Sequence, residues 1–128
     1  MILIDTSAWI NFLRKSGERN LKLKVAELLD FEFAAWTCPI KFELLSGARE
    51  NEKNDILEML SFSSRIIFSD PHWEMAAKIE KTLRKNGITV PRDDIFVSAC
   101  SICEEIPLLH NDRHFEMISK SFPLELQT

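Results

Sequence analysis

Glycine and proline are scarce in this chain, and their placement excludes several kinds of protein. The 128 residues include three glycines and five prolines, which are spread along the sequence. That spacing leaves no low-complexity tract and no flexible linker between domains. The glycines stand alone, so the sequence has no glycine-rich phosphate loop, and it has no Gly-x-Ser-x-Gly elbow. We therefore expect one domain that spans residues 1–128.

Long apolar runs and paired cysteines are also missing. No run approaches the roughly 20 residues that cross a bilayer, and the opening residues 1–5 lack the basic segment and cleavage site of a secretory signal. Three cysteines do not form a disulfide framework and suit a reducing compartment. Cys100 and Cys103 have redox or metal spacing, but they fall in an apolar helical pattern, which favours core packing. We expect a cytoplasmic protein with no membrane partner.

An excess of basic residues is absent too. The formal net charge is −4 and the isoelectric point is near 5.4, which argues mildly against a nucleic-acid partner because such proteins usually present a basic surface. The objection weakens if several acids share a metal site, since bound cations invert the local field and the remaining Lys and Arg can form a basic rim.

Short apolar runs alternate with amphipathic segments along the whole chain. The pattern predicts strands at 2–4, 33–36, 66–68 and 107–109, with 124–126 as a candidate edge strand. Between them it predicts helices at 8–13, 21–29, 39–45, 54–62, 70–86, 95–104 and 113–120. Such alternation is typical of a parallel or mostly parallel sheet with helices on both faces. Functional groups in such folds lie at the carboxyl ends of the strands.

Two aspartates follow predicted strands directly. Asp5 ends the first strand and Asp112 follows the fourth. A lone aspartate at a strand-to-helix junction usually caps the helix, but Thr6 or Ser7 is available as the cap of the first helix. Two aspartates at equivalent strand ends therefore favour a site over two caps.

Two further acids complete a candidate set. Asp94 stands at a predicted helix start, where either Asp93 or Asp94 serves as the cap and the other is free. Glu43 interrupts an apolar helix face and carries little weight alone. Four carboxylates in one cleft repel each other unless a cation is present. Oxygen ligands of this kind favour Mg²⁺ or Mn²⁺ over zinc, and one or two such ions activate water against a phosphodiester.

Four segments of the chain resemble the motif regions of a known family. They are residues 1–10 (MILIDTSAWI), 43–47 (ELLSG), 94–99 (DIFVSA) and 108–115 (LLHNDRHF). Together they resemble PIN-domain ribonucleases, and most closely the VapC-type toxins of bacterial and archaeal toxin–antitoxin pairs.

The resemblance implies a three-layer α/β/α sandwich and a Mg²⁺- or Mn²⁺-dependent endoribonuclease with one or two ions. It makes Asp5, Glu43, Asp94 and Asp112 the catalytic, metal-binding acids, with Thr6 as a supporting polar group. It also implies an RNA substrate, homodimerisation and a cognate antitoxin protein that blocks the groove.

One position departs from the family pattern. The family often has Thr or Ser two residues before the last acid, where this chain has His110. None of the three histidines has ligand spacing, and His110 is the one candidate for proton transfer or RNA contact. Arg113 is a further candidate for phosphate contact, together with other basic residues that flank the acids in sequence, namely Arg14, Lys15, Lys41, Arg49 and Arg92.

Three alternatives stay open at this point. The chain could be a housekeeping PIN-type nuclease rather than a toxin, or a non-catalytic PIN-fold interaction module. A strand-end aspartate also suits phosphoryl transfer through an aspartyl-phosphate at Asp5, although the sequence lacks a second aspartate two residues on.

Overall fold

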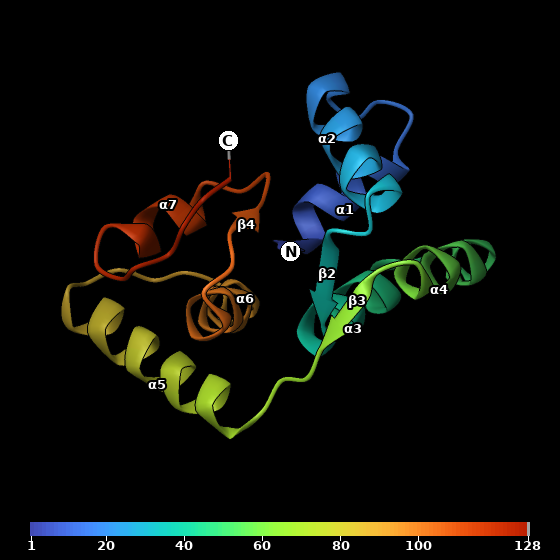
Figure 1. Ribbon diagram of the computed structural model, residues 1–128. Helices are drawn as coiled ribbons and strands as arrows, with labels where there is room; N and C mark the ends of the chain where they lie inside the picture. Colours follow the sequence, from blue (N-terminus) through green and yellow to red (C-terminus); the bar gives the residue numbers. More distant parts are fainter. Residues whose placement is uncertain (128) are drawn as a thin grey trace.

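Four short strands form a parallel sheet whose order reverses once. The computed structural model describes residues 1–127 (Figure 1). The sheet order is β3-β2-β1-β4, and each neighbouring pair is parallel. The strands are β1 (Ile2–Ile4), β2 (Ala34–Thr37), β3 (Ser64–Ile66) and β4 (Leu108–Leu109). The chain moves outward from β1 to β3 and then returns past β1 to form β4.

This reversal determines where a site can form. In open α/β sheets, the crevice at the carboxyl ends of the strands is widest where the strand order reverses. Here β1 and β4 are those neighbours, with Leu3 beside Leu108 and Ile4 beside Leu109. The residues that follow Ile4 and Leu109 therefore emerge side by side, which brings Asp5 and the 110–112 loop to one edge.

Helices cover both faces of the sheet. Residues 1–127 contain seven α-helices, and a short 3₁₀ segment, Glu50–Glu52, precedes the fourth. They are α1 (Thr6–Leu13), α2 (Arg19–Asp30), α3 (Cys38–Gly47), α4 (Lys53–Ser61), α5 (Asp70–Lys85), α6 (Arg92–Glu104) and α7 (His114–Ser119). Within these residues, no helix is both long and apolar enough to cross a membrane. The three-layer α/β/α prediction is correct.

The core lies between the sheet and its helices. Trp9 of α1, Ile40 of α3, Val97 of α6 and Phe115 of α7 are all fully buried. Such apolar burial is the main favourable term in folding. Each of these four helices therefore contributes a side chain to one shared core.

Several local predictions are wrong. The third strand is Ser64–Ile66 rather than 66–68, and Ile67 is exposed. The 124–126 edge strand is reduced to one isolated bridge between Leu108 and Leu126. Helix α6 begins at Arg92, three residues early, because Pro91 serves as its N-cap residue with an extended backbone. Neither acid of the 93–94 pair is therefore a cap, since both lie inside the first turn.

Candidate metal centre

Asp5 has a double role at the end of β1. It is the N-cap of α1, so the prediction that Thr6 or Ser7 caps this helix is wrong. Its Oδ2 accepts hydrogen bonds from the Ser7 backbone N–H at 3.0 Å and from the Ser7 hydroxyl at 2.6 Å. Its Oδ1 is buried and has no hydrogen-bond partner among residues 1–127. Capping therefore occupies one oxygen and leaves the other free, and burial raises the pKa of Asp5.

Ser7 ties the ends of β1 and β4 together. Its hydroxyl donates to Asp5 and also accepts a hydrogen bond from the Asn111 backbone N–H at 2.9 Å. This bond joins residues 104 positions apart in the chain. It holds the 110–112 loop against α1, and the negative charge of Asp112 adds to burial in raising the pKa of Asp5.

Asp94 approaches the same place from the first turn of α6. It is buried, and that burial raises the pKa of its carboxyl to about 7, with the charges of Asp5 and Asp112 acting in the same direction. A hydrogen bond with His114 opposes the rise without cancelling it. Helix α6 therefore points a carboxyl at both strand-end aspartates.

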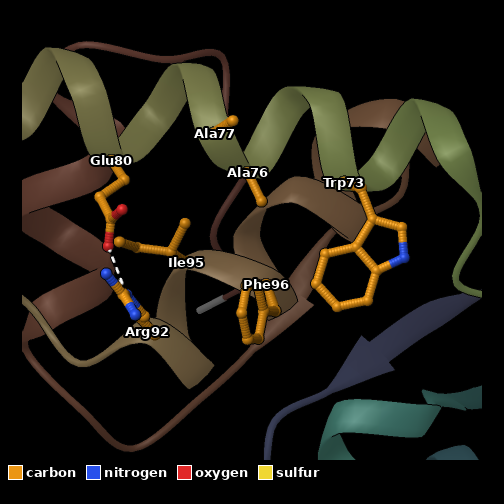
Figure 2. A pocket seen from close by; sticks show the side chains of 7 residues that line it. All are labelled: Trp73, Ala76, Ala77, Glu80, Arg92, Ile95 and Phe96. Carbon is orange, nitrogen blue, oxygen red and sulfur yellow. Dashed lines mark hydrogen bonds and ion pairs between the residues drawn. The ribbon is translucent and has the colours of Figure 1, made fainter.

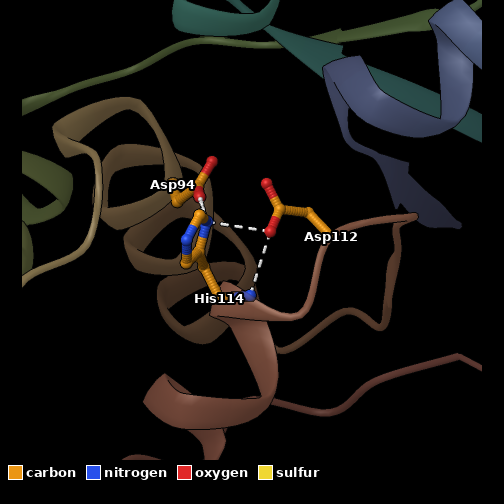
Figure 3. A group of neighbouring side chains, drawn as sticks. All are labelled: Asp94, Asp112 and His114. Carbon is orange, nitrogen blue, oxygen red and sulfur yellow. Dashed lines mark hydrogen bonds and ion pairs between the residues drawn. The ribbon is translucent and has the colours of Figure 1, made fainter.

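Asp112 and His114 lie beside Asp94 (Figure 3). His114 Nδ1 lies 2.8 Å from Asp112 Oδ1 and 3.0 Å from Asp94 Oδ2. The His114 backbone N–H also donates to Asp112 Oδ1 at 3.0 Å. Sequence reasoning missed His114. Its one signal was the Asp-x-His spacing, because an aspartate that bonds the N–H two residues on turns the following side chain back toward itself.

Glu43 comes from α3, and the charge of Asp5 acts on it. Its Oε1 accepts a hydrogen bond from the Thr6 hydroxyl at 2.8 Å. Burial nevertheless raises its pKa to about 7, and the charges of Asp93 and Asp5 contribute to the rise. Asp93, which sequence reasoning regarded as a cap candidate, is therefore a fifth acid at this edge.

The four candidate acids thus lie in one cluster, linked through Asp5, whose charge acts on both Glu43 and Asp94. Carboxyls that are this crowded and buried remain charged only if positive charge is supplied. The unpartnered buried oxygen of Asp5 and the carboxylates gathered around it fit a hard divalent cation. The residues present therefore suit Mg²⁺ or Mn²⁺, while the cysteines that zinc favours are not in the cluster.

His110 lies next to the cluster in a supporting position. Its Nδ1 accepts a hydrogen bond from the Asp112 backbone N–H at 3.1 Å, and its ring packs 5.1 Å from that of Phe115. Both contacts shape the loop that presents Asp112. Between the two histidines of this segment, His114 rather than His110 contacts the carboxylates.

A groove of about 710 Å³ leads away from the cluster at Glu43. It runs between α1 and α3, with apolar residues such as Ile10 and Leu44 in its lining. Its basic residues are Arg14, Lys15 and Arg49. On the opposite side, Arg113 is exposed and lines a smaller hollow beside His114 and Lys120. The acid cluster therefore has basic side chains on two sides despite the net negative charge.

A second hollow, between α5 and α6, has a different character (Figure 2). Trp73 and Phe96 pack edge to face within it, with ring centroids 5.2 Å apart. Its one carboxylate, Glu80, forms an ion pair with Arg92 at 2.8 Å. The lining therefore offers no uncompensated acid, and Arg92 is already engaged on this face rather than directed at the acid cluster.

Comparison with known proteins shows the family to which the fold belongs. An α/β/α fold with acids gathered where the strand order reverses defines a class of PIN-like proteins. Residues 2–121 match the PIN domain, and the chain belongs to the PIN-domain family.

Two relatives within this family are similar to the chain over most of their length. The chain is 34% identical over 125 residues to "Ribonuclease VapC11" of Mycobacterium tuberculosis, covering 94% of this chain and 92% of the relative. It is 26% identical over 127 residues to "Ribonuclease VapC1" of Methanocaldococcus jannaschii, covering 98% and 85%.

A solved structure, VapBC2 from Rickettsia felis bound to a DNA fragment from its promoter, aligns with a TM-score of 0.80. The alignment has 20% identity and covers 99% of this chain and 98% of that one, which shows the shared fold. The predicted resemblance to PIN-domain proteins of the VapC type is therefore correct.

Proposed function

We propose that this protein is a metal-dependent endoribonuclease that hydrolyses RNA phosphodiester bonds. The observation that carries the proposal is the convergence of Asp5, Glu43, Asp94 and Asp112 at one sheet edge, with a buried carboxylate oxygen of Asp5 left without a partner. The ribonuclease names of relatives such as that of M. tuberculosis support it.

The four acids are the proposed catalytic residues and cation ligands, for one or two Mg²⁺ or Mn²⁺ ions. When bound, such an ion lowers the pKa of water and offsets the charge of a phosphate under attack. Thr6 orients Glu43 through its hydroxyl, and Ser7 orients Asp5 and holds the loop before Asp112. These bonds hold the carboxylates in position before substrate arrives, which is how a site contributes without a protein nucleophile.

RNA is held by charge around the cluster. We assign phosphate contacts to Arg14, Lys15 and Arg49 in the groove and to Arg113 on the opposite rim. Lys and Arg contacts of this kind supply affinity that does not depend on sequence and that weakens with salt. Arg14→Ala is therefore expected to reduce the salt dependence of RNA binding without changing which sequences are cut.

The decisive test is cleavage of a mixed single-stranded RNA pool with Mg²⁺ or Mn²⁺ by wild type and Asp5→Asn. Asparagine caps helices as well as aspartate does, so the bond from Ser7 survives while the cation ligand is weakened. We expect cleavage to be abolished with an unchanged circular dichroism spectrum. Asp30→Asn, an exposed acid at the end of α2, is the matched control. Undiminished cleavage by Asp5→Asn overturns the proposal, and Mn²⁺ binding without cleavage by wild type indicates a non-catalytic module.

We further propose that the protein is the toxin of a type II toxin–antitoxin pair. Support comes from the VapC names of its relatives and from VapBC complexes that share its fold. Expression is expected to arrest growth, and co-expression of a small cognate antitoxin protein encoded beside it is expected to restore growth. Growth that continues despite active enzyme favours a housekeeping nuclease in the cytoplasm, where RNA and free thiols both occur.

A homodimer is the proposed assembly. Trp73 and Ile67 are both more than half exposed although they are large and apolar, and a second copy can cover them. Light scattering is expected to give twice the mass of the chain for wild type and a monomer for Trp73→Arg. A monomeric wild type contradicts this part of the proposal alone.

A further inference from the structure

His114 brings a nitrogen donor into contact with two of the four proposed cation ligands. Nδ1 lies 2.8 Å from Asp112 Oδ1 and 3.0 Å from Asp94 Oδ2 (Figure 3). The three donor atoms all lie within 4.8 Å of one another. The backbone N–H of the same histidine donates to Asp112 Oδ1, so the residue is held at both ends by this aspartate.

The contact needs a proton or a cation between its atoms. A ring nitrogen carries at most one hydrogen, yet two carboxylate oxygens face this one at hydrogen-bond distance. If none of the three atoms carries a hydrogen, three lone pairs meet and repel. A proton relieves one contact well, whereas a cation relieves all of them. Adjacent ligands around an octahedral ion with bonds of roughly 2.1 Å lie about 3.0 Å apart, which matches both distances.

A separate observation places a cation here. Asp5 is 2% exposed, its Oδ1 has no hydrogen-bond partner among residues 1–127, and its carboxyl is close enough to feel the charge of Asp112. A buried carboxylate oxygen with no donor is costly, and the charge of Asp5 acts on Asp94, which is one of the two acids that contact His114. One proton on His114 therefore does not supply enough positive charge to balance the carboxylates of this pocket.

We propose that His114 Nδ1 is itself a cation ligand beside Asp94 and Asp112, and that this nitrogen makes the site prefer Mn²⁺ to Mg²⁺. The inference rests on the proposed function in one respect, that the acids bind a divalent cation. Imidazole is a softer donor than carboxylate and favours transition metals, while Mg²⁺ prefers oxygen ligands and water. The ring is 31% exposed, so Nε2–H can be satisfied by solvent while Nδ1 faces inward.

The test is Mn²⁺ binding to metal-free protein, followed by calorimetry and by pulsed electron paramagnetic resonance, which detects nitrogen bound to the ion. Wild type is expected to show the coupling of one histidine nitrogen. His114→Asn is expected to lose that coupling and to bind Mn²⁺ at least tenfold more weakly, the approximate effect that even outer-shell partners have. Mg²⁺ affinity is expected to fall less. His110→Asn, the matched control in the same loop, is expected to keep the coupling.

The outcomes separate the inference from the proposed function. Mn²⁺ bound by wild type without nitrogen coupling overturns the inference and leaves the metal site intact, with His114 as a hydrogen-bond donor only. No Mn²⁺ binding at all overturns both. If His114→Asn does not fold, ¹⁵N-histidine labelling of His110→Asn replaces it. The coupling must then change to the ¹⁵N pattern, and an unchanged signal overturns the inference.

Discussion

The acid cluster has two halves that share a charge and differ in their neighbours. In the α6 half, Asp94 and Asp112 are bridged by His114. In the α3 half, Glu43 has the Thr6 hydroxyl as a donor and Asp93 as a further acid. One half thus contains a side chain that can carry positive charge, and the other contains only a neutral donor and more negative charge.

Despite this difference, the pKa of the buried carboxyl is raised in the same way in both halves. Burial raises the pKa of Asp94 and that of Glu43 to about 7, and in both cases a hydrogen bond opposes the rise without reversing it. Local partners therefore orient these carboxyls but do not neutralise the cluster. The fold thus keeps an excess of negative charge at this edge, which costs stability until a cation binds.

The largest expected effect is that of Asp94→Asn. This change removes a carboxylate from the half that contains His114, so metal-dependent RNA cleavage should fall by more than about a hundredfold. It also removes a buried acid from a crowded site, so metal-free protein at pH 8 should melt a few degrees higher, about 3–5 °C. Cleavage assays and thermal unfolding measure the two effects. Retained cleavage would show that the α6 half is not the catalytic one.

The pH dependence of stability tests both halves together. The Asp94 and Glu43 carboxyls have folded-state pKa values of about 7, above their ordinary values of 3.8 and 4.5. Unfolded chains therefore release these protons first, and the stabilisation is complete below about pH 4 and lost as pH rises through 7. Metal-free protein should melt about 3–6 °C lower at pH 8 than at pH 5.5. Mn²⁺ should restore stability at pH 8.

The control for this pH effect is the double variant Asp94→Asn with Glu43→Gln. It lacks both raised pKa values, so its melting temperature should change less over the same window. An equal slope in the double variant would assign the pH dependence to groups outside the cluster.

A smaller effect should distinguish the two acids of the α3 half. Glu43→Gln keeps an oxygen that can accept from Thr6 but removes the charge, so Mn²⁺ affinity should fall about tenfold. Asp93→Asn removes a neighbour that raises the pKa of Glu43, and Mn²⁺ affinity should stay within about threefold. Calorimetry measures both. Equal losses would make Asp93 a ligand beside Glu43 in the α3 half.

The smallest effect is that of Thr6→Val, which keeps the shape of the side chain and removes its hydroxyl. Glu43 then loses its 2.8 Å hydrogen bond, and the free energy of unfolding should fall by about 1 kcal/mol. Urea denaturation measures the change. Thr6→Ser retains the donor and serves as the control, so a loss of equal size in both variants would attribute the effect to packing.

Much of the fold could be predicted from local pattern. The apolar run at 2–4 and the helix capped near Gly87 depend on burial and backbone preferences that a short segment already contains, and both are confirmed, with Gly87 at a φ of 72°. Boundaries were less predictable. The start of α6 depends on Pro91 as N-cap, and β3 depends on pairing with β2, where Ala35 lies beside Ser64. Neither is settled by hydrophobic period alone.

The candidate site was partly predictable for the same reason. Asp5 and Asp112 follow predicted parallel strands, so the sequence places them at one edge of the sheet. The resemblance to PIN-domain ribonucleases adds Asp94 and Glu43. The role of these acids as ligands stays a prediction. The donors around them could not be inferred, because the bond from Ser7 to Asn111 spans 104 positions and that from Thr6 to Glu43 spans 37.

The sequence by itself determined the layered α/β architecture, the parallel sheet and the acids at its edge, because periodicity and strand ends are local properties. Only the tertiary structure decided how each acid is used. It made Asp5 both a helix cap and a carrier of one free oxygen, brought Asp93 beside Glu43, and placed His114 rather than His110 against the carboxylates. Electrostatics acts through space, so the pKa of a buried carboxyl depends on neighbours that chain order does not reveal.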